Sequence, residues 1–223
     1  MKKVTVILML LLLLSLVSCG GDRIVEIDEE AFLTEAKAIL SAADELNTVL
    51  FEPAGIPVIE DGFSTGKYKA VYLNRCEGFN RISLKAIHEK IDSIYSEAMA
   101  QTVEMLVFNP DIVDGEPIRY ARYIEFQSGD KDHPQNGTLM AYTGMTEFWS
   151  DEIDIDTESI SFVSAVKEAK SGDTVVTVTV NVTVTAKNGA TQTRNLDFRF
   201  IEVDGGYRLD DLVTLVYDEA LKN

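Results

Sequence analysis

The sequence has few of the side chains on which catalysis, disulfide bonding and nucleic-acid binding usually depend. Its 223 residues include two cysteines, two histidines and one tryptophan, and 20 basic residues stand against 37 acidic ones. The formal net charge of −17 argues against a nucleic-acid partner, because an acidic surface repels phosphate groups. Two cysteines exclude a dense disulfide framework, and the two histidines lack the spacing of a zinc site. No glycine-rich phosphate loop or nucleophile elbow is present, so no cofactor and no catalytic residue is predicted.

The first 18 residues have the regions of a secretory signal. Residues 1–3 give a basic start, residues 4–14 are an apolar run, and Leu16-Val17-Ser18-Cys19 follows. The run is shorter than the roughly 20 residues that a membrane-spanning helix needs. The four residues ending at Cys19 resemble the lipobox of bacterial lipoproteins, which implies cleavage before Cys19 and acylation of its sulfur and its new amino terminus. We therefore expect a lipid anchor on the exported side of the cell membrane or outer membrane, with an ordinary secreted protein as the alternative.

Removing the leader changes the charge and leaves one cysteine alone. Lys plus Arg falls from 20 to 18 while Asp plus Glu stays at 37, so the net charge becomes −19. Residues 19–28 are predicted to be a tether, residues 29–217 a single domain and residues 218–223 a tail. A chain of about 205 residues can bury a core without disulfides. Cys76 is predicted to be a buried structural thiol, and a nucleophilic thiol is the alternative.

Helical periodicity and capping residues predict three helices. Asp28 can cap the first, because Glu29 and Glu30 then lie in the first turn, where the helix dipole favours negative charge. Ser83 can cap the second, and a third is expected from about Ser96 to Val107. The predicted apolar stripe of the first helix consists of Phe32, Ala36, Ile39, Ala43, Leu46 and Leu50, and that of the second of Leu84, Ile87, Ile91, Ile94 and Ala98.

A period of two follows Gly115 and predicts strands. Residues 118–126 predict a strand whose inward positions include Tyr120, Ile124 and Phe126, with Arg122 as the charged exception. Valine alternates with threonine or asparagine over residues 176–185, and Asn188-Gly189 supplies the turn of a hairpin. The other expected strands are residues 68–73, 138–142, 159–167 and 207–216, with an acidic connector over residues 150–158 and a bulge near residues 200–201.

These elements predict an α+β domain in which N-terminal helices pack on one face of a curved antiparallel sheet. The segment LDFRFIEVDGGYRLDDL, residues 196–212, resembles the end of the nuclear transport factor 2-like fold, which implies a cone-shaped sheet that encloses a pocket. The long first helix, residues 82–87 and the closing Gly-Gly-Tyr are also similar to exported proteins of Gram-positive bacteria that inhibit DL-endopeptidases of the cell wall.

Three side chains are candidate ligand-binding groups of such a pocket: Tyr120, Arg122 and Tyr142. The alternative to ligand binding is that the two tyrosines pack their rings against the core and that the arginine lies at the rim of the sheet. The acidic runs are interpreted as solvated loops and not as calcium sites, because neither has the order of carboxylates that a calcium loop requires.

The favoured function is a lipid-anchored, non-catalytic domain that binds a protein or a small ligand in the cell envelope. A specific version is control of a cell-wall hydrolase, in which the acidic loop 127–137 or the segment 150–158 blocks the cleft of the enzyme. The alternatives are an isomerase-like or dehydratase-like enzyme that uses a polar residue in the cone, and a structural or assembly role.

Overall fold

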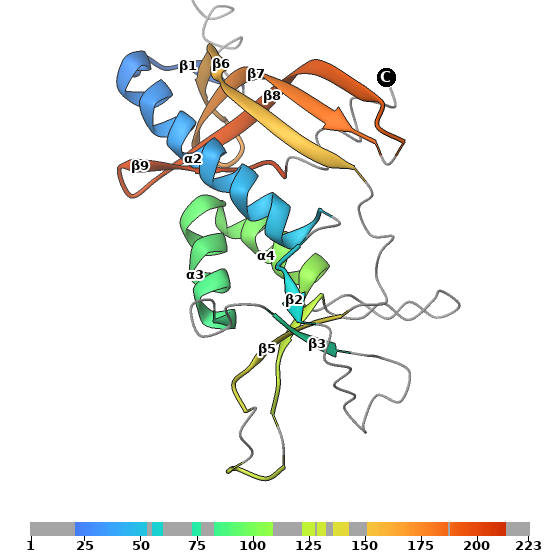
Figure 1. The fold of residues 1–223 in the computed structure, drawn as a ribbon. Helices are drawn as coiled ribbons and strands as arrows, with labels where there is room; N and C mark the ends of the chain where they lie inside the picture. The colour runs from blue at the N-terminus through green and yellow to red at the C-terminus, as the bar shows by residue number, and fades with distance from the viewer. Residues whose placement is uncertain are drawn as a thin grey trace, which may run out of the picture.

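The protein is a mixed α+β structure of three helices and two antiparallel sheets within the part described (Figure 1). The computed structural model describes residues 21–52, 55–59, 73–76, 83–108, 122–127, 129–132, 136–142, 151–186 and 188–212. The α+β class predicted from the sequence is confirmed. The sequence predicted one sheet, whereas the structure contains a five-stranded sheet and a separate four-stranded one.

Two helices begin after the predicted cap residues Asp28 and Ser83, and the third begins next to Ser96, where its start was expected. They are α2 (Glu29–Leu50), α3 (Leu84–Ile94) and α4 (Glu97–Val107). The side chains of Asp28, Ser83 and Ser96 each accept a hydrogen bond from a backbone N–H of the first turn, which satisfies a donor that the helix itself leaves unpaired. The helix starts were therefore readable from local sequence alone.

One position of the α2 stripe differs from the prediction. Leu40 is fully buried and Ile39 only partly, so the buried face passes through Ala36, Leu40 and Ala43. A helical face with steps of three and four residues can include either Ile39 or Leu40. The elements that pack against α2 determine which of the two is buried. In α3 the predicted Ile87, Ile91 and Ile94 are buried.

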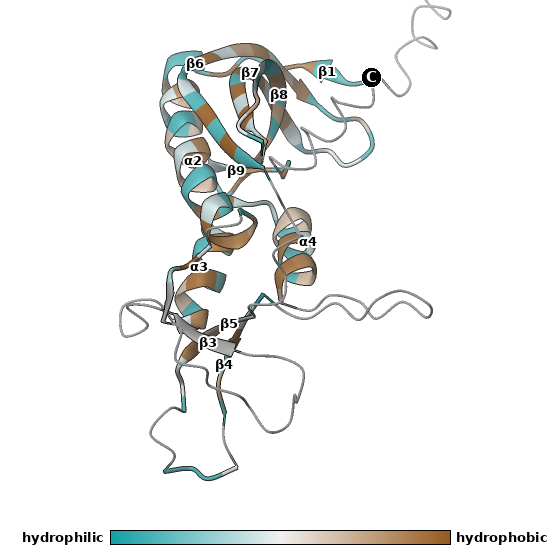
Figure 2. Cartoon of the chain, turned by 45° about the vertical axis from the view of Figure 1, so that its right-hand side comes forward, coloured by the Kyte–Doolittle hydropathy of each residue, from teal (hydrophilic) through white to brown (hydrophobic). Residues whose placement is uncertain are grey.

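The larger sheet has the strand order β1-β6-β7-β8-β9, and α2 packs against it (Figure 1). Its strands are β1 (Arg23–Ile24), β6 (Glu152–Lys167), β7 (Thr174–Thr185), β8 (Thr191–Val203) and β9 (Gly206–Leu209). The alternating valines of β7 are all buried, as predicted from the period of two. Figure 2 shows the hydrophilic and hydrophobic residues alternating along β6.

Both predicted turns are present in this sheet. Gly189 has a φ of 79° in the β7–β8 turn, where Asn188 Oδ1 accepts a hydrogen bond from the Ala190 N–H. In the β8–β9 turn, Asp204 has a φ of 51° and Gly205 a φ of 79°. Asparagine, aspartate and glycine are the residues that enter this left-handed region at least cost.

Three expectations for the larger sheet were wrong. Residues 150–158 are not a connector, because β6 already begins at Glu152. The pairing of β7 with β8 runs without a bulge, and the irregularities lie in β6, between Asp156 and Ser161 and between Phe162 and Ser164. The last strand ends at Leu209 and does not continue through the described residues that follow.

The smaller sheet was not predicted as a separate unit. Its order is β2 (Val58–Ile59), β3 (Leu73–Cys76), β5 (Leu139–Tyr142) and β4 (Tyr123–Glu125), with every pairing antiparallel. The strand at residues 139–142 matches its prediction. The predicted orientation of β4 was wrong, because Tyr123 is buried while Ile124 and Phe126 are only partly buried.

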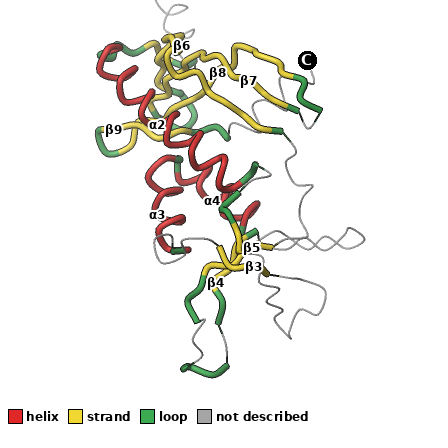
Figure 3. Tube along the Cα trace, viewed as in Figure 1, coloured by secondary structure: helices red, strands yellow, loops and turns green. Residues whose placement is uncertain are grey.

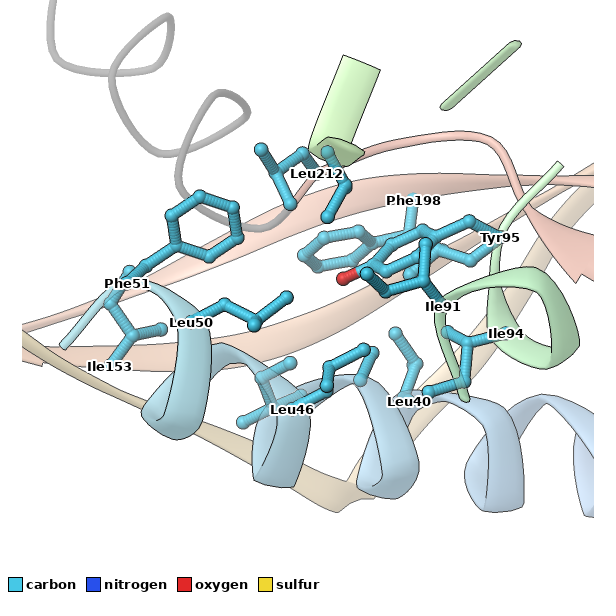
Figure 4. Close-up of a cluster of buried hydrophobic side chains, with 14 of the residues drawn as sticks. Leu40, Leu46, Leu50, Phe51, Ile91, Ile94, Tyr95, Ile153, Phe198 and Leu212 are labelled. Atoms are coloured by element: carbon cyan, nitrogen blue, oxygen red, sulfur yellow. The ribbon is translucent and has the colours of Figure 1, made fainter. Parts of the chain in front are cut away.

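The main core lies between α2, the end of α3 with its junction to α4, and the larger sheet (Figure 4). Leu40, Ile91 and Phe198 are fully buried at its centre, and Phe32 meets Phe200 edge-on at 5.6 Å between ring centroids. Tyr95 lies in the same cluster with its hydroxyl oxygen directed inward. Among the described residues no helix is both long and apolar enough to span a bilayer.

Candidate functional site

The structure describes the side chain of only one of the three predicted pocket residues. Tyr120, the predicted lipid-attachment residue Cys19 and the second histidine, His133, lie outside the described residues. The backbone of Tyr142 pairs with that of Leu73 in the smaller sheet, but its side chain is outside the description, as is that of Cys76. Arg122 is therefore the one predicted ligand-binding side chain whose contacts can be examined.

Arg122 binds the carboxyl end of α2. Its Nη1 donates a hydrogen bond of 2.7 Å to the Leu50 carbonyl, and its Nη2 donates to the Glu52 carbonyl. The last turn of α2 contains no basic residue of its own. A cation at this end of a helix is favourable, since the final carbonyl groups carry partial negative charge and lack partners within the helix. Arg122 thus supplies from a distant segment the positive charge that α2 lacks.

The neighbour of Arg122 completes the same junction. The Tyr123 hydroxyl donates to the Val49 carbonyl at 2.5 Å and accepts from the Ile56 N–H at 3.0 Å. Gly55 faces both side chains, at a φ of 55°, and a Cβ atom there would clash with them. This contact explains why a glycine follows the end of α2, and it fixes the smaller sheet to the helix.

A group of polar side chains lies where α2 covers the outer edge of β6. Glu52 is buried, and its Oε1 accepts a hydrogen bond of 3.1 Å from the Ile153 N–H. The Asp44 carboxylate accepts from the Ile155 N–H, two residues along the strand. These N–H groups have no strand beside them at this edge, because β1 pairs only with Val166 and Lys167. The carboxylates therefore close an edge that could otherwise pair with another chain.

The same group contains oxygen atoms that the fold does not satisfy. Asp44 Oδ1 and Asn47 Oδ1 are buried and have no hydrogen-bond partner within the described ranges. Burial, together with the negative charges of the Asp154 and Glu52 carboxylates, raises the pKa of Asp44 to about 7, and the hydrogen bond from the Ile155 N–H opposes this shift. Burial also raises the pKa of Tyr95, with a contribution from the Asp44 charge. A carboxyl group that titrates near neutrality is suited to respond to pH.

The pKa of Asp44 predicts a specific dependence of stability on pH. Because the folded pKa of about 7 exceeds the unfolded value of 3.8, the folded state binds the proton more tightly. The resulting stability is complete below pH 4 and is lost as the pH rises to 7. Asp44→Asn keeps an oxygen for the Ile155 N–H but cannot ionise. We expect it to raise the free energy of unfolding at pH 8 by about 1–2 kcal/mol, allowing for partial exposure.

Urea unfolding at several pH values measures this effect. The advantage of Asp44→Asn should grow between pH 4 and pH 7 and then stay constant. Asp197→Asn is the matched control, because Asp197 is an exposed aspartate on β8. If Asp44→Asn raised the free energy of unfolding equally at pH 5 and pH 8, Asp44 would not titrate as stated.

A groove of about 680 Å³ lies between α3, α4 and the β8–β9 hairpin. Its volume is within the range of about 300–1,000 Å³ typical of ligand sites. Met105 and Val203, with exposed fractions of 44% and 39%, line it together with the buried Ala100 and Tyr95. The other lining residues are polar or charged, namely Asp92, Glu97, Gln101, Glu104 and Arg208.

The charges of the groove are partly held by neighbouring groups. Glu104 Oε1 lies 2.5 Å from Nδ1 of His88, whose ring in turn packs on Phe108. Arg208 donates from Nη1 to the carbonyl of its own neighbour Tyr207. The sequence excluded the two histidines from a zinc site and indicated no role for Met105. The groove was missed because its residues come from three elements, and only their packing brings them together.

The loop between β4 and β5 forms an exposed hairpin tip at the end of the molecule opposite the larger sheet (Figures 1 and 3). Gly129, Asp130, Lys131 and Asp132 are exposed there. The Asn136 Nδ2 donates to the Asp130 carbonyl at 2.8 Å and to the Lys131 carbonyl at 3.2 Å. Asp130 Oδ1 accepts from the Asp132 N–H at 3.1 Å. These bonds connect the described residues 130–132 and 136 of the tip to one another.

Comparison with known proteins adds no further assignment. The chain matches no protein-family model, no curated protein and no solved structure. Within the described segments, no group of three or more histidine, cysteine, aspartate or glutamate side chains could hold a metal ion. The groove and the hairpin tip are therefore the two surfaces from which function can be argued.

Proposed function

We propose that this protein is a lipid-anchored bacterial cell-envelope protein whose domain binds a protein partner through the hairpin tip, without catalysing a reaction. The observation that carries the proposal is the tip itself. It is exposed, is braced by the Asn136 side chain, and lies far from the larger sheet (Figure 3). Hydrogen bonds that already restrict residues 130–132 and 136 lower the loss of conformational freedom on binding, which favours affinity.

The charge of the tip suggests the kind of partner. Asp130 and Asp132 surround the single cation Lys131, and Glu125 lies at the end of β4 nearby. An acidic, protruding loop suits the cleft of an enzyme that carries positive charge, and a cell-wall hydrolase is the candidate that the sequence resemblance suggests. The segment 150–158, the other loop considered, is excluded from this role because it belongs to β6.

The fold adds support of a general kind. The long helix α2, the antiparallel larger sheet and the Asp-Gly-Gly turn before Tyr207 are compatible with a nuclear transport factor 2-like domain, which we propose as the fold family. A domain of this type presents loops at the end of its sheet, and fold by itself does not decide activity.

Inhibition of a hydrolase tests the function directly. The full chain in detergent, at micromolar concentration, is expected to slow the release of peptides from purified peptidoglycan by a DL-endopeptidase. Asp132→Lys should weaken this inhibition at least fivefold, because it reverses the charge at the centre of the contact. Asp132 is exposed, so the variant should fold.

The control variant makes the same change of charge elsewhere. Asp197→Lys alters an exposed residue of β8 and should leave the inhibition unchanged within twofold. If the unchanged protein does not slow the hydrolase, or if both variants lose inhibition equally, the proposed role of the hairpin tip is wrong.

A further inference from the structure

We propose that the groove between α3, α4 and the β8–β9 hairpin is a second binding site, for a short peptide segment that carries lysine or arginine beside apolar side chains. This inference is independent of the hairpin tip. The shape, the apolar surface and the charge of the groove support this proposal.

The shape comes from one face of α4 that the described residues leave partly uncovered. Glu97, Ala100, Gln101, Glu104 and Met105 line the groove, and their spacing of three, four, seven and eight residues places them on one side of the helix. This face is about 12 Å long at 1.5 Å per residue. An extended peptide advances about 3.3 Å per residue, so about four residues would cover it.

The apolar surface is concentrated there. The described residues include four large hydrophobic side chains that are exposed: Ile24, Met105, Val163 and Val203. Two of these, Met105 and Val203, line the groove from opposite sides, on α4 and at the end of β8. Methionine is flexible and adapts to differing apolar partners, which suits a peptide site. The remaining two lie on β1 and β6.

The charge of the groove selects the sign of the ligand. Among the described residues, three carboxylates, those of Asp92, Glu97 and Glu104, line it against the guanidinium of Arg208, and Glu104 is already bound to His88, which leaves Asp92 and Glu97 for a ligand. Arg208 already donates to the Tyr207 carbonyl, which directs part of its hydrogen-bonding capacity away from a ligand. The whole chain has a net charge of −17 and adds to the attraction of a basic segment.

The free edge of β9 is not the binding element. The Tyr207 N–H donates to Glu35 Oε1 at 2.9 Å, and the Leu209 carbonyl accepts from the Ser96 N–H at 2.8 Å. Because these outward-facing groups of β9 are used, a peptide cannot extend the sheet here by strand addition. The ligand must be held by its side chains, with apolar groups on Met105 and Val203 and cations near Glu97.

Fluorescence anisotropy with labelled six-residue peptides tests the proposal on the full chain in detergent. A peptide of alternating lysine and leucine is expected to bind saturably. Peptides of alternating glutamate and leucine, or lysine and serine, should bind at least tenfold more weakly. Raising the salt concentration from 50 to 500 mM should weaken binding of the lysine–leucine peptide several-fold, because exposed charges are screened.

Two pairs of variants locate the site. Glu97→Lys and Met105→Ser should each weaken binding at least fivefold, and their controls Asp197→Lys and Val163→Ser should change it less than twofold. Glu97, Met105, Asp197 and Val163 are all exposed, so circular dichroism should show the same folded state. Absence of saturable binding, equal binding of the lysine–serine peptide, or equal loss in a variant and its control would each overturn the proposal.

Discussion

Replacement of Cys19 by serine is expected to abolish the attachment of fatty acid to this protein. The residues before Cys19 have the order of a lipoprotein signal, with a basic start, an apolar run and Leu16-Val17-Ser18 before the cysteine. Serine has no thiol for the thioether bond to the lipid. Each methylene group buried in a bilayer contributes about 0.8 kcal/mol, so two or three acyl chains hold a protein firmly where none would.

Metabolic labelling with radioactive palmitate measures this expectation. The label should be incorporated into the unchanged protein and be absent from Cys19→Ser. Cys76→Ser is the matched control, because Cys76 is the only other cysteine of the chain. The Cys76→Ser variant should incorporate as much palmitate as the unchanged protein. Label that persists in Cys19→Ser would show that this protein is not a lipoprotein of the proposed type.

Replacement of Arg122 by methionine is expected to lower the free energy of unfolding by about 3 kcal/mol. The change removes two charge-assisted hydrogen bonds to the Leu50 and Glu52 carbonyls, each worth about 1.5–3 kcal/mol, while the methionine keeps most of the apolar stem. The last carbonyl groups of α2 then lose their cation, and part of the loss is recovered as water reaches them. For a domain of this size the melting temperature should fall by about 6–12 °C.

Arg122→Lys separates capping of the helix from loss of packing. Lysine retains the charge but not the paired geometry of the guanidinium, so it should restore about half of the lost stability. Thermal and urea unfolding measure both variants. The sequence predicted Arg122 as a ligand-binding group, and that role would instead leave stability unchanged. A change of less than 0.5 kcal/mol in Arg122→Met would contradict the capping role.

The hydrogen bonds of Arg122 show why this site was not readable from the sequence. The strand pattern identified Arg122 as a charged exception among apolar neighbours, which was correct as an observation. Its partner Leu50 lies 72 residues away, and nothing in either local pattern specifies the other. The same holds for the groove, whose three elements meet only through tertiary packing.

The buried carboxylates illustrate a different limit. Residues 150–158 contain so many acidic side chains that a solvated connector was predicted. In the folded protein the carboxylates of Asp44 and Glu52, in and just after α2, accept hydrogen bonds from the backbone N–H groups of Ile155 and Ile153 in β6. An acidic strand is therefore stable at this edge because α2 covers it, which composition alone does not indicate.

What the sequence determined by itself was local. The caps at Asp28 and Ser83, the start of the third helix near Ser96, and the period of two in β7 depend on residues within a few positions of one another. The tertiary structure alone decided that β6 begins at Glu152, that Tyr123 faces inward, and that a second sheet forms. Those outcomes depend on which distant groups meet, because a buried N–H or carbonyl must find a partner wherever the chain places one.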